Sequence, residues 1–162
     1  MSAIDEALLR NQAYASTYYR RHFPHQPTKR LAVVACMDAR IDVYRVLGLE
    51  PGDAHVIRNA GGVVTEDVIR SLLISQRLLG TEEILLLHHT GCGMQTFRDD
   101  DLKATVERDT GVRPPFALEA FADLEGDVRQ SIARLRASLF VADRHVRGFV
   151  YDVETGRLAE VR

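Results

Sequence analysis

Residues 31 to 36 read Leu-Ala-Val-Val-Ala-Cys, a short apolar run without a charge. A run of this kind is typical of a central parallel strand that is covered on both faces. Two further strand-like stretches follow, Ala54 to Arg58 (AHVIR) and Glu83 to His89 (EILLLHH). We expect these three stretches to form the centre of one sheet.

Helical patterns alternate with the strands, and that alternation is the mark of an α/β domain. The pattern predicts helices at about residues 4–21, 43–47, 65–79, 99–108 and 118–137. It also predicts a fourth strand at Arg147 to Asp152 and a short edge strand at Leu158 to Val161. We expect one α/β domain over residues 1–162, with a mostly parallel sheet of order 2-1-3-4, an antiparallel edge strand and flanking helices. Residues 1–24 would form an N-terminal helical arm.

Composition excludes several classes of protein. A chain of 162 residues can bury roughly two-thirds of its unfolded surface, so it needs no disulfide scaffold. Lys and Arg number 21 against 23 Asp and Glu, which leaves no basic field for nucleic acid or anionic lipid. No apolar run approaches the roughly 18 residues of a membrane span. We expect a cytoplasmic protein with a small-molecule substrate and neither a nucleic-acid nor a membrane partner.

The two cysteines stand at the ends of predicted strands. Cys36 ends the first strand, and Cys92 follows the third strand together with His89. The carboxyl ends of neighbouring parallel strands meet at a crevice that favours ligand sites. Two thiolates and an imidazole supply three of the four positions of a tetrahedral zinc site. Taken alone, the cysteines could be two free core thiols, but Asp38 and Arg40 beside Cys36 favour a site.

Three motifs resemble the signature of the β-class carbonic anhydrases, in their compact bacterial form. They are CMDAR at 36–40, RNAGG at 58–62 and HHTGCGM at 88–94. The resemblance implies the fold of that family and a zinc lyase that interconverts carbon dioxide and bicarbonate. It implies Cys36, His89 and Cys92 as zinc ligands, and Asp38 and Arg40 as a catalytic dyad.

The expected chemistry follows from zinc. The metal lowers the pKa of a bound water, and the resulting hydroxide attacks carbon dioxide to give bicarbonate and a proton. Asp38 can reach that water or the metal itself, and a bidentate Arg40 can hold it off the metal. Gly61 and Gly93 are candidate substrate-binding residues, because a backbone N–H can face bicarbonate.

Other functions remain open on the same residues. Zinc hydroxide can hydrolyse another heterocumulene, such as carbonyl sulfide or carbon disulfide. Asp38 can instead complete a closed, non-catalytic zinc site as its fourth ligand, and Asp38 with Arg40 can be a purely structural ion pair. A redox dithiol is disfavoured, because the cysteines do not form a Cys-x-x-Cys pair. His88 should point to the face of the sheet opposite His89.

The first predicted helix suggests a partner. Ile4, Leu8, Tyr14, Tyr18 and Tyr19 offer more apolar surface than a peripheral helix readily hides on its own subunit. We expect a homodimer or a dimer-based tetramer, as the resemblance also implies.

Overall fold

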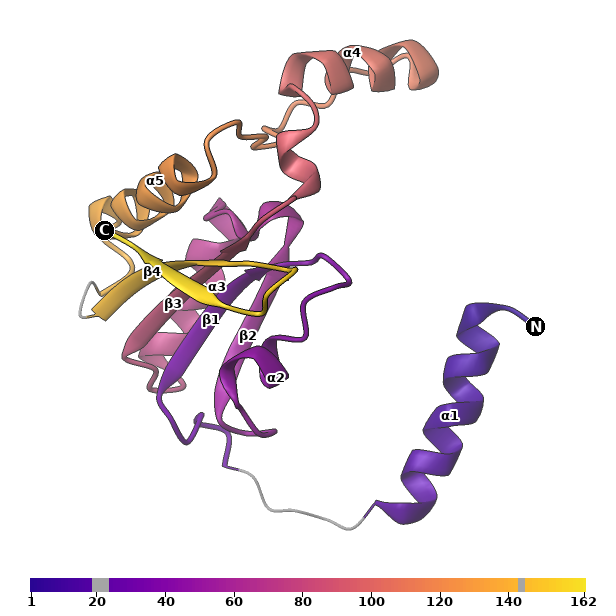
Figure 1. Ribbon diagram of the computed structural model, residues 1–162, viewed down its shortest axis with the longest axis vertical. Coiled ribbons are helices and arrows are strands. Elements are labelled where there is room, and N and C mark those ends of the chain that lie inside the picture. The colour runs from indigo at the N-terminus through magenta and orange to yellow at the C-terminus, as the bar shows by residue number, and fades with distance from the viewer. Residues whose placement is uncertain (19–23, 143–144) are drawn as a thin grey trace.

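A five-stranded sheet forms the centre of the protein (Figure 1). The computed structural model describes residues 1–18, 24–142 and 145–162. The strand order is β2-β1-β3-β4-β5, for Ala54–Asn59, Leu31–Cys36, Glu83–His89, His145–Tyr151 and Leu158–Val161. The first four strands are parallel, and β5 pairs antiparallel with β4. The predicted order and the antiparallel edge strand are confirmed.

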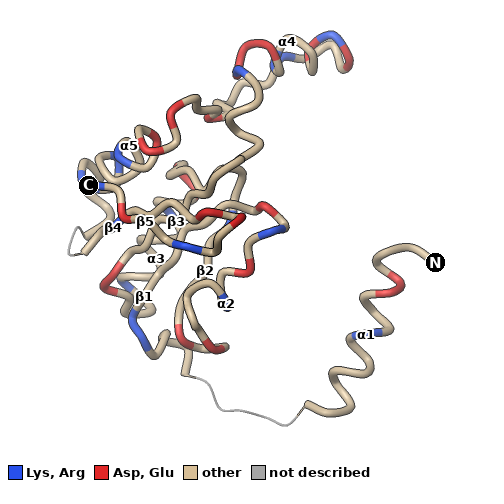
Figure 2. The backbone as a smooth tube through the Cα atoms, in the orientation of Figure 1, with Lys and Arg blue, Asp and Glu red and all other residues tan. Residues whose placement is uncertain are grey.

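The helices are distributed unequally around this sheet. Their bounds are α1 Ala3–Thr17, α2 Val43–Leu47, α3 Glu66–Arg77, α4 Asp99–Thr110 and α5 Leu124–Ala137, with 3-10 turns η1 at Ala60–Gly62 and η2 at Gly93–Gln95. Neither α1 nor α4 contributes a buried residue, and both project from the body of the molecule (Figure 1). Both signs of charge gather on α4, whereas α1 carries few charges (Figure 2).

No helix in the described ranges combines the length and apolar character that crossing a membrane requires. The cytoplasmic location stays a prediction.

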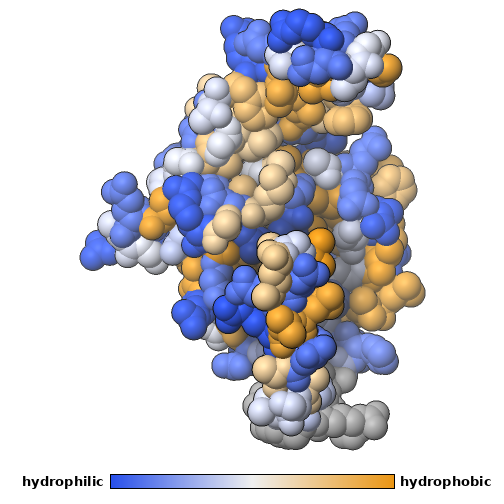
Figure 3. Space-filling model, turned by 90° about the vertical axis from the view of Figure 1, so that its right-hand side faces the viewer, coloured by the Kyte–Doolittle hydropathy of each residue, from blue (hydrophilic) through white to orange (hydrophobic). Residues whose placement is uncertain are grey.

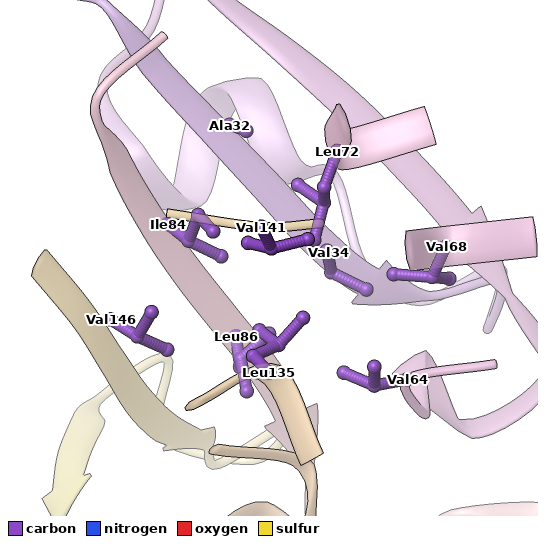
Figure 4. Packing of buried hydrophobic residues seen from close by; sticks show 10 residues of the cluster. All are labelled: Ala32, Val34, Val64, Val68, Leu72, Ile84, Leu86, Leu135, Val141 and Val146. Carbon is purple, nitrogen blue, oxygen red and sulfur yellow. The ribbon is translucent and has the colours of Figure 1, made fainter. Parts of the chain in front are cut away.

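The hydrophobic core lies in two layers, one on each face of the sheet. On one face, α3 and α5 pack over the strands (Figure 4), with Ala32, Val34, Val64, Val68, Leu72, Ile84, Leu86, Leu135, Val141 and Val146 buried. On the other face, Val33, Ala35 and Leu87 are buried against residues that include Val43 of α2. The central strands are therefore covered on both faces, as their uninterrupted apolar sequence predicts.

Helix caps explain where two of the helices begin. Thr65 accepts a hydrogen bond from the Val68 N–H at the start of α3, and Glu66 and Asp67 occupy its first turn. Asp123 accepts from the Gly126 N–H at the start of α5. Such side chains satisfy backbone N–H groups that have no partner inside the helix, and acidic residues suit the positive end of the helix dipole.

One predicted helix is wrong over its first turns. Residues 118–123 were expected to begin a helix running to 137, but α5 begins only at Leu124. The N–H groups of Leu118, Glu119 and Ala120 donate to the Asp99 carboxylate and not to a helix. In the first predicted helix, α1 ends at Thr17, and residues 19–21 lie outside the described residues. Tyr19 therefore has no described position.

Candidate metal centre

Cys36, His89 and Cys92 converge at the carboxyl ends of β1 and β3. One possible ligand atom from each residue lies within 4.8 Å of the others, and all three residues are buried. The two sulfur atoms are 3.9 Å apart. Strand pairing explains the convergence, because β1 and β3 run parallel as neighbours and end at the same edge. The structure thus brings together the three predicted metal ligands.

The His89 ring is oriented as a metal ligand would be. Its Nδ1 lies 3.0 Å from the Thr90 carbonyl oxygen, which makes Nδ1 the donor. Its Nε2 is buried without a hydrogen-bond partner among the described residues. An unpaired buried nitrogen is costly unless something binds it. Two sulfurs and one imidazole nitrogen form a donor set that suits zinc, so these residues fit the ion implied by the sequence.

The protein environment shifts the pKa values of the two thiols in opposite directions. Burial opposes ionisation of Cys36, but the nearby His89 imidazole and the N–H groups of Asp38 and Gly61 outweigh it and lower the Cys36 pKa. Burial raises the pKa of Cys92, and its nearness to Cys36 raises it further, although the Met94 N–H donates to its sulfur. Each sulfur is therefore the acceptor of at least one backbone N–H.

Asp38 and Arg40 form a tight ion pair beside the three ligands. Arg40 Nε donates to Asp38 Oδ1 at 2.9 Å, and an Arg40 terminal nitrogen donates to Oδ2 at 2.7 Å. The Arg40 side chain and backbone N–H hold the pKa of the Asp38 carboxyl well below its usual range. Asp38 Oδ2 lies 3.8 Å from His89 Nε2. An ionised carboxylate thus stands at the edge of the metal centre, fixed by Arg40.

The RNAGG motif packs around the Cys36 backbone. Arg58 Nε donates to the Cys36 carbonyl at 3.0 Å, and an Arg58 terminal nitrogen donates to the Asp38 carbonyl at 2.8 Å. A Cβ at Gly62 would lie 2.9 Å from the Cys36 nitrogen, and Gly62 has a φ of +71°. Both facts require glycine. Gly61 donates its N–H to the Cys36 sulfur, and Gly93 lies next to Cys92.

The sequence predicted the orientation of His88 but did not single out other residues near the site. His88 does point away from His89, and its Nε2 lies 2.7 Å from Asp127 Oδ2 in α5. Met94 and Phe121 lie against Gly61, yet neither carries a chemical signature that would mark it in a sequence. The use of Arg58 as a backbone clamp was also missed, although its motif was quoted.

Comparison with protein families agrees with this geometry. The family model described as carbonic anhydrase matches residues 31–158. The chain is 56% identical to "Beta-carbonic anhydrase 1" of Mycobacterium tuberculosis over 99% of each chain. It is 33% identical to a carbon disulfide hydrolase of Saccharolobus solfataricus, over 96% of this chain and 87% of that one.

A solved structure is similar along the whole chain. It is a carbonic anhydrase from Streptococcus mutans, which superimposes with a TM-score of 0.94 at 46% sequence identity. The alignment covers 100% of this chain and 99% of the other.

Proposed function

Since the chain belongs to the β-carbonic anhydrase family, we propose that it catalyses the reversible hydration of carbon dioxide to bicarbonate and a proton. The observation that carries this proposal is the buried Cys36, His89 and Cys92 cluster with the Asp38 carboxylate at its edge. A structural zinc site is usually closed by four protein ligands, whereas a catalytic site keeps one position open. Cys36, His89 and Cys92 supply three ligands, and Arg40 engages the nearby Asp38 carboxylate. This arrangement suits a catalytic zinc site.

Zinc would be held by Cys36 Sγ, His89 Nε2 and Cys92 Sγ. When bound, zinc supplies Lewis acidity, which lowers the pKa of water and makes it nucleophilic near neutral pH. The Thr90 carbonyl fixes the His89 ring, because it accepts the Nδ1 hydrogen and leaves Nε2 for the metal.

Asp38 and Arg40 supply orientation and charge. The Asp38 carboxylate is ionised and can accept a hydrogen bond from water that enters beside His89 Nε2. Arg40 also donates to the Gly91 carbonyl at 2.9 Å, so it ties the loop after β1 to the loop after β3. With its carboxylate engaged by Arg40, Asp38 would stay off a bound metal and leave one ligand position open for water. A substrate-binding role for Gly61 and Gly93 stays a prediction.

The sulfur analogues of carbon dioxide are the second candidate substrates, because a relative at 33% identity is a carbon disulfide hydrolase. The experiment is a parallel assay of the zinc-loaded protein. Stopped-flow measurement of carbon dioxide hydration is set against sulfide release from carbon disulfide and carbonyl sulfide. We expect hydration to dominate by kcat/KM. Sulfide release at the higher kcat/KM would reverse the assignment, and a zinc-loaded protein inactive on all three would favour the closed, non-catalytic site.

We also propose a single domain in which residues 1–24 form an arm that packs on a second copy. Among the apolar side chains of α1, Ile4 is 72% exposed and Leu8 is 59% exposed. The sheet face that carries α2 keeps half-buried Leu31, Leu85 and Phe149. On the side seen in Figure 3, hydrophobic side chains gather below the hydrophilic tip formed by α4. An exposed apolar helix and an incompletely covered sheet face complement each other across a twofold axis.

A further inference from the structure

Phe121 lies against Gly61 and Met94. The backbone N–H groups of these two residues donate to the sulfurs of the proposed metal ligands. The Phe121 ring carbon Cε1 lies 3.1 Å from the position that a Cβ on Gly61 would occupy, and Met94 Cγ lies 3.0 Å from the same position. Its backbone N–H donates to the Met94 carbonyl at 3.2 Å. The Gly61 N–H donates to the sulfur of Cys36, and the Met94 N–H donates to that of Cys92. Phe121 therefore lies against both donor residues, against Gly61 through its ring and against Met94 through its backbone N–H.

A buried polar pair, His88 and Asp127, lies beside the Phe121 ring. The His88 ring lies 5.7 Å from the Phe121 ring, centroid to centroid. His88 is fully buried, and the Asp127 side chain that faces its Nε2 is 13% exposed. Removing one member of such a buried pair strongly destabilises a protein, so the pair fixes the His88 ring against which the Phe121 ring lies. The first turn of α5 is thereby tied to β3, one residue before the ligand His89.

We propose that Phe121, held in place by His88 and Asp127, is a positioning residue. It keeps the N–H groups of Gly61 and Met94 within hydrogen-bonding distance of the Cys36 and Cys92 sulfurs. This inference rests on the proposed function, since it takes Cys36 and Cys92 as metal ligands. A hydrogen bond to a ligand sulfur withdraws electron density from it, and groups that orient metal ligands typically alter metal affinity about 10–100-fold. Phe121 acts on the metal only through Gly61 and Met94.

The test is the absorption spectrum of the full-length protein with cobalt(II) in place of zinc. Phe121→Leu shortens the side chain and should shift the sulfur-to-cobalt charge-transfer band to lower energy. It should also speed cobalt loss to a chelator, roughly tenfold. Phe116→Leu is the matched control, because Phe116 lies in the same connection but is 63% exposed. That control should keep the band and the release rate of the parent.

The Asp127 variants test the same idea without altering the ring. Asp127→Ala should shift the band in the same direction as Phe121→Leu. Asp127→Asn should restore the parent spectrum, since its amide oxygen can still accept from His88 Nε2. Asp123→Ala is the control for stability, because it removes the α5 cap and leaves the His88 partner in place. We expect it to lower the melting temperature without moving the band.

The outcomes separate this inference from the proposed function. If Phe121→Leu and Asp127→Ala lower stability but keep the parent band and release rate, the two residues are merely structural and the inference is wrong. If the parent itself binds cobalt without a sulfur charge-transfer band, both the metal assignment and this inference are wrong.

Discussion

At the scale of single residues, the activity of the site depends on whether the Asp38 carboxylate stays paired with Arg40 or binds the metal. Its Oδ2 lies 3.8 Å from His89 Nε2 and 2.7 Å from an Arg40 nitrogen. The same oxygen can thus serve a water at the metal or, if it moves, bind the metal itself. Arg40 decides between these states because its bidentate geometry holds both carboxylate oxygens.

This arrangement predicts the effect of removing either partner. Asp38→Ala and Arg40→Ala should each keep one zinc per chain, because neither residue is a proposed metal ligand. Each should lower kcat by roughly a hundredfold, Asp38→Ala by removing the acceptor and Arg40→Ala by freeing Asp38 to occupy the metal. Metal analysis and stopped-flow hydration measure the two quantities.

Arg45→Ala is the matched control for Arg40, since the Arg45 side chain is 89% exposed and pairs only at the surface with Asp42. It should retain the parent rate. Parent rates in both Asp38→Ala and Arg40→Ala would instead make the pair a structural ion pair.

The sequence predicted the residues whose chemistry is visible in their type. Cysteine, histidine, aspartate and arginine at matched strand ends are rare combinations, and the structure brings Cys36, His89, Cys92, Asp38 and Arg40 together. Phe121 was not predicted. A phenylalanine distant in sequence has no spacing relation to the motifs, and its part in the site depends on tertiary packing.

At the scale of elements, the connection from α4 to α5 shows where local sequence patterns fail. Residues 118–123 have helical composition, but the Asp99 carboxylate accepts three of their N–H groups. Glu119 takes a φ of +63°, which is strained for a residue with a side chain. A contact from outside the segment outweighs its helix propensity, and no local pattern reports such a contact.

Asp99→Asn should therefore destabilise the protein. The loss should be about 1–3 kcal/mol at pH 7, because a neutral amide replaces a charged acceptor of several N–H groups. Burial raises the pKa of the Asp99 carboxyl, but the bonds from Ala120, Leu118 and Glu119 outweigh it and lower the pKa below its ordinary value. The carboxylate contributes fully above its unfolded pKa of about 3.9 and loses its contribution as the pH falls through the folded value.

Urea unfolding at pH 7 and at successively lower pH measures this difference. The gap between parent and Asp99→Asn should shrink below about pH 4. Asp100→Asn is the control, since the Asp100 side chain is 90% exposed. A gap that stays constant down to acid pH would contradict the assignment.

At the scale of the whole molecule, the sheet could be predicted from the sequence. For the N-terminal arm, the helix could be predicted but its partner could not. Apolar strands separated by helices specify parallel pairing, and the order 2-1-3-4-5 follows the expected winding. Assembly depends on a second copy and is not visible in one chain. What the single chain shows is α1 without a buried residue and a sheet face on which Leu31, Leu85 and Phe149 stay half-buried.

Deletion of residues 1–22 should convert a dimer into monomers at micromolar concentration, as measured by light scattering. Helix α1 supplies apolar surface that the rest of the described chain does not bury, so its loss should remove much of the interface. Leu8→Glu should weaken the dimer in the same way. Arg10→Glu is its control, because residue 10 lies on the opposite side of the helix. A parent protein that is monomeric and fully active would contradict the proposed dimer. A truncated form that still dimerises would contradict the role of the arm in the interface.

The central claim is that Cys36, His89 and Cys92 hold the zinc on which carbon dioxide hydration depends. Its most direct test is the stopped-flow hydration rate, measured while zinc is added to metal-free protein. The rate of the parent should rise in proportion to zinc and level off at one zinc per chain, while Cys36→Ser stays near the uncatalysed rate throughout. A parent that remains inactive at one zinc per chain, or a Cys36→Ser variant that follows the parent curve, would contradict the claim.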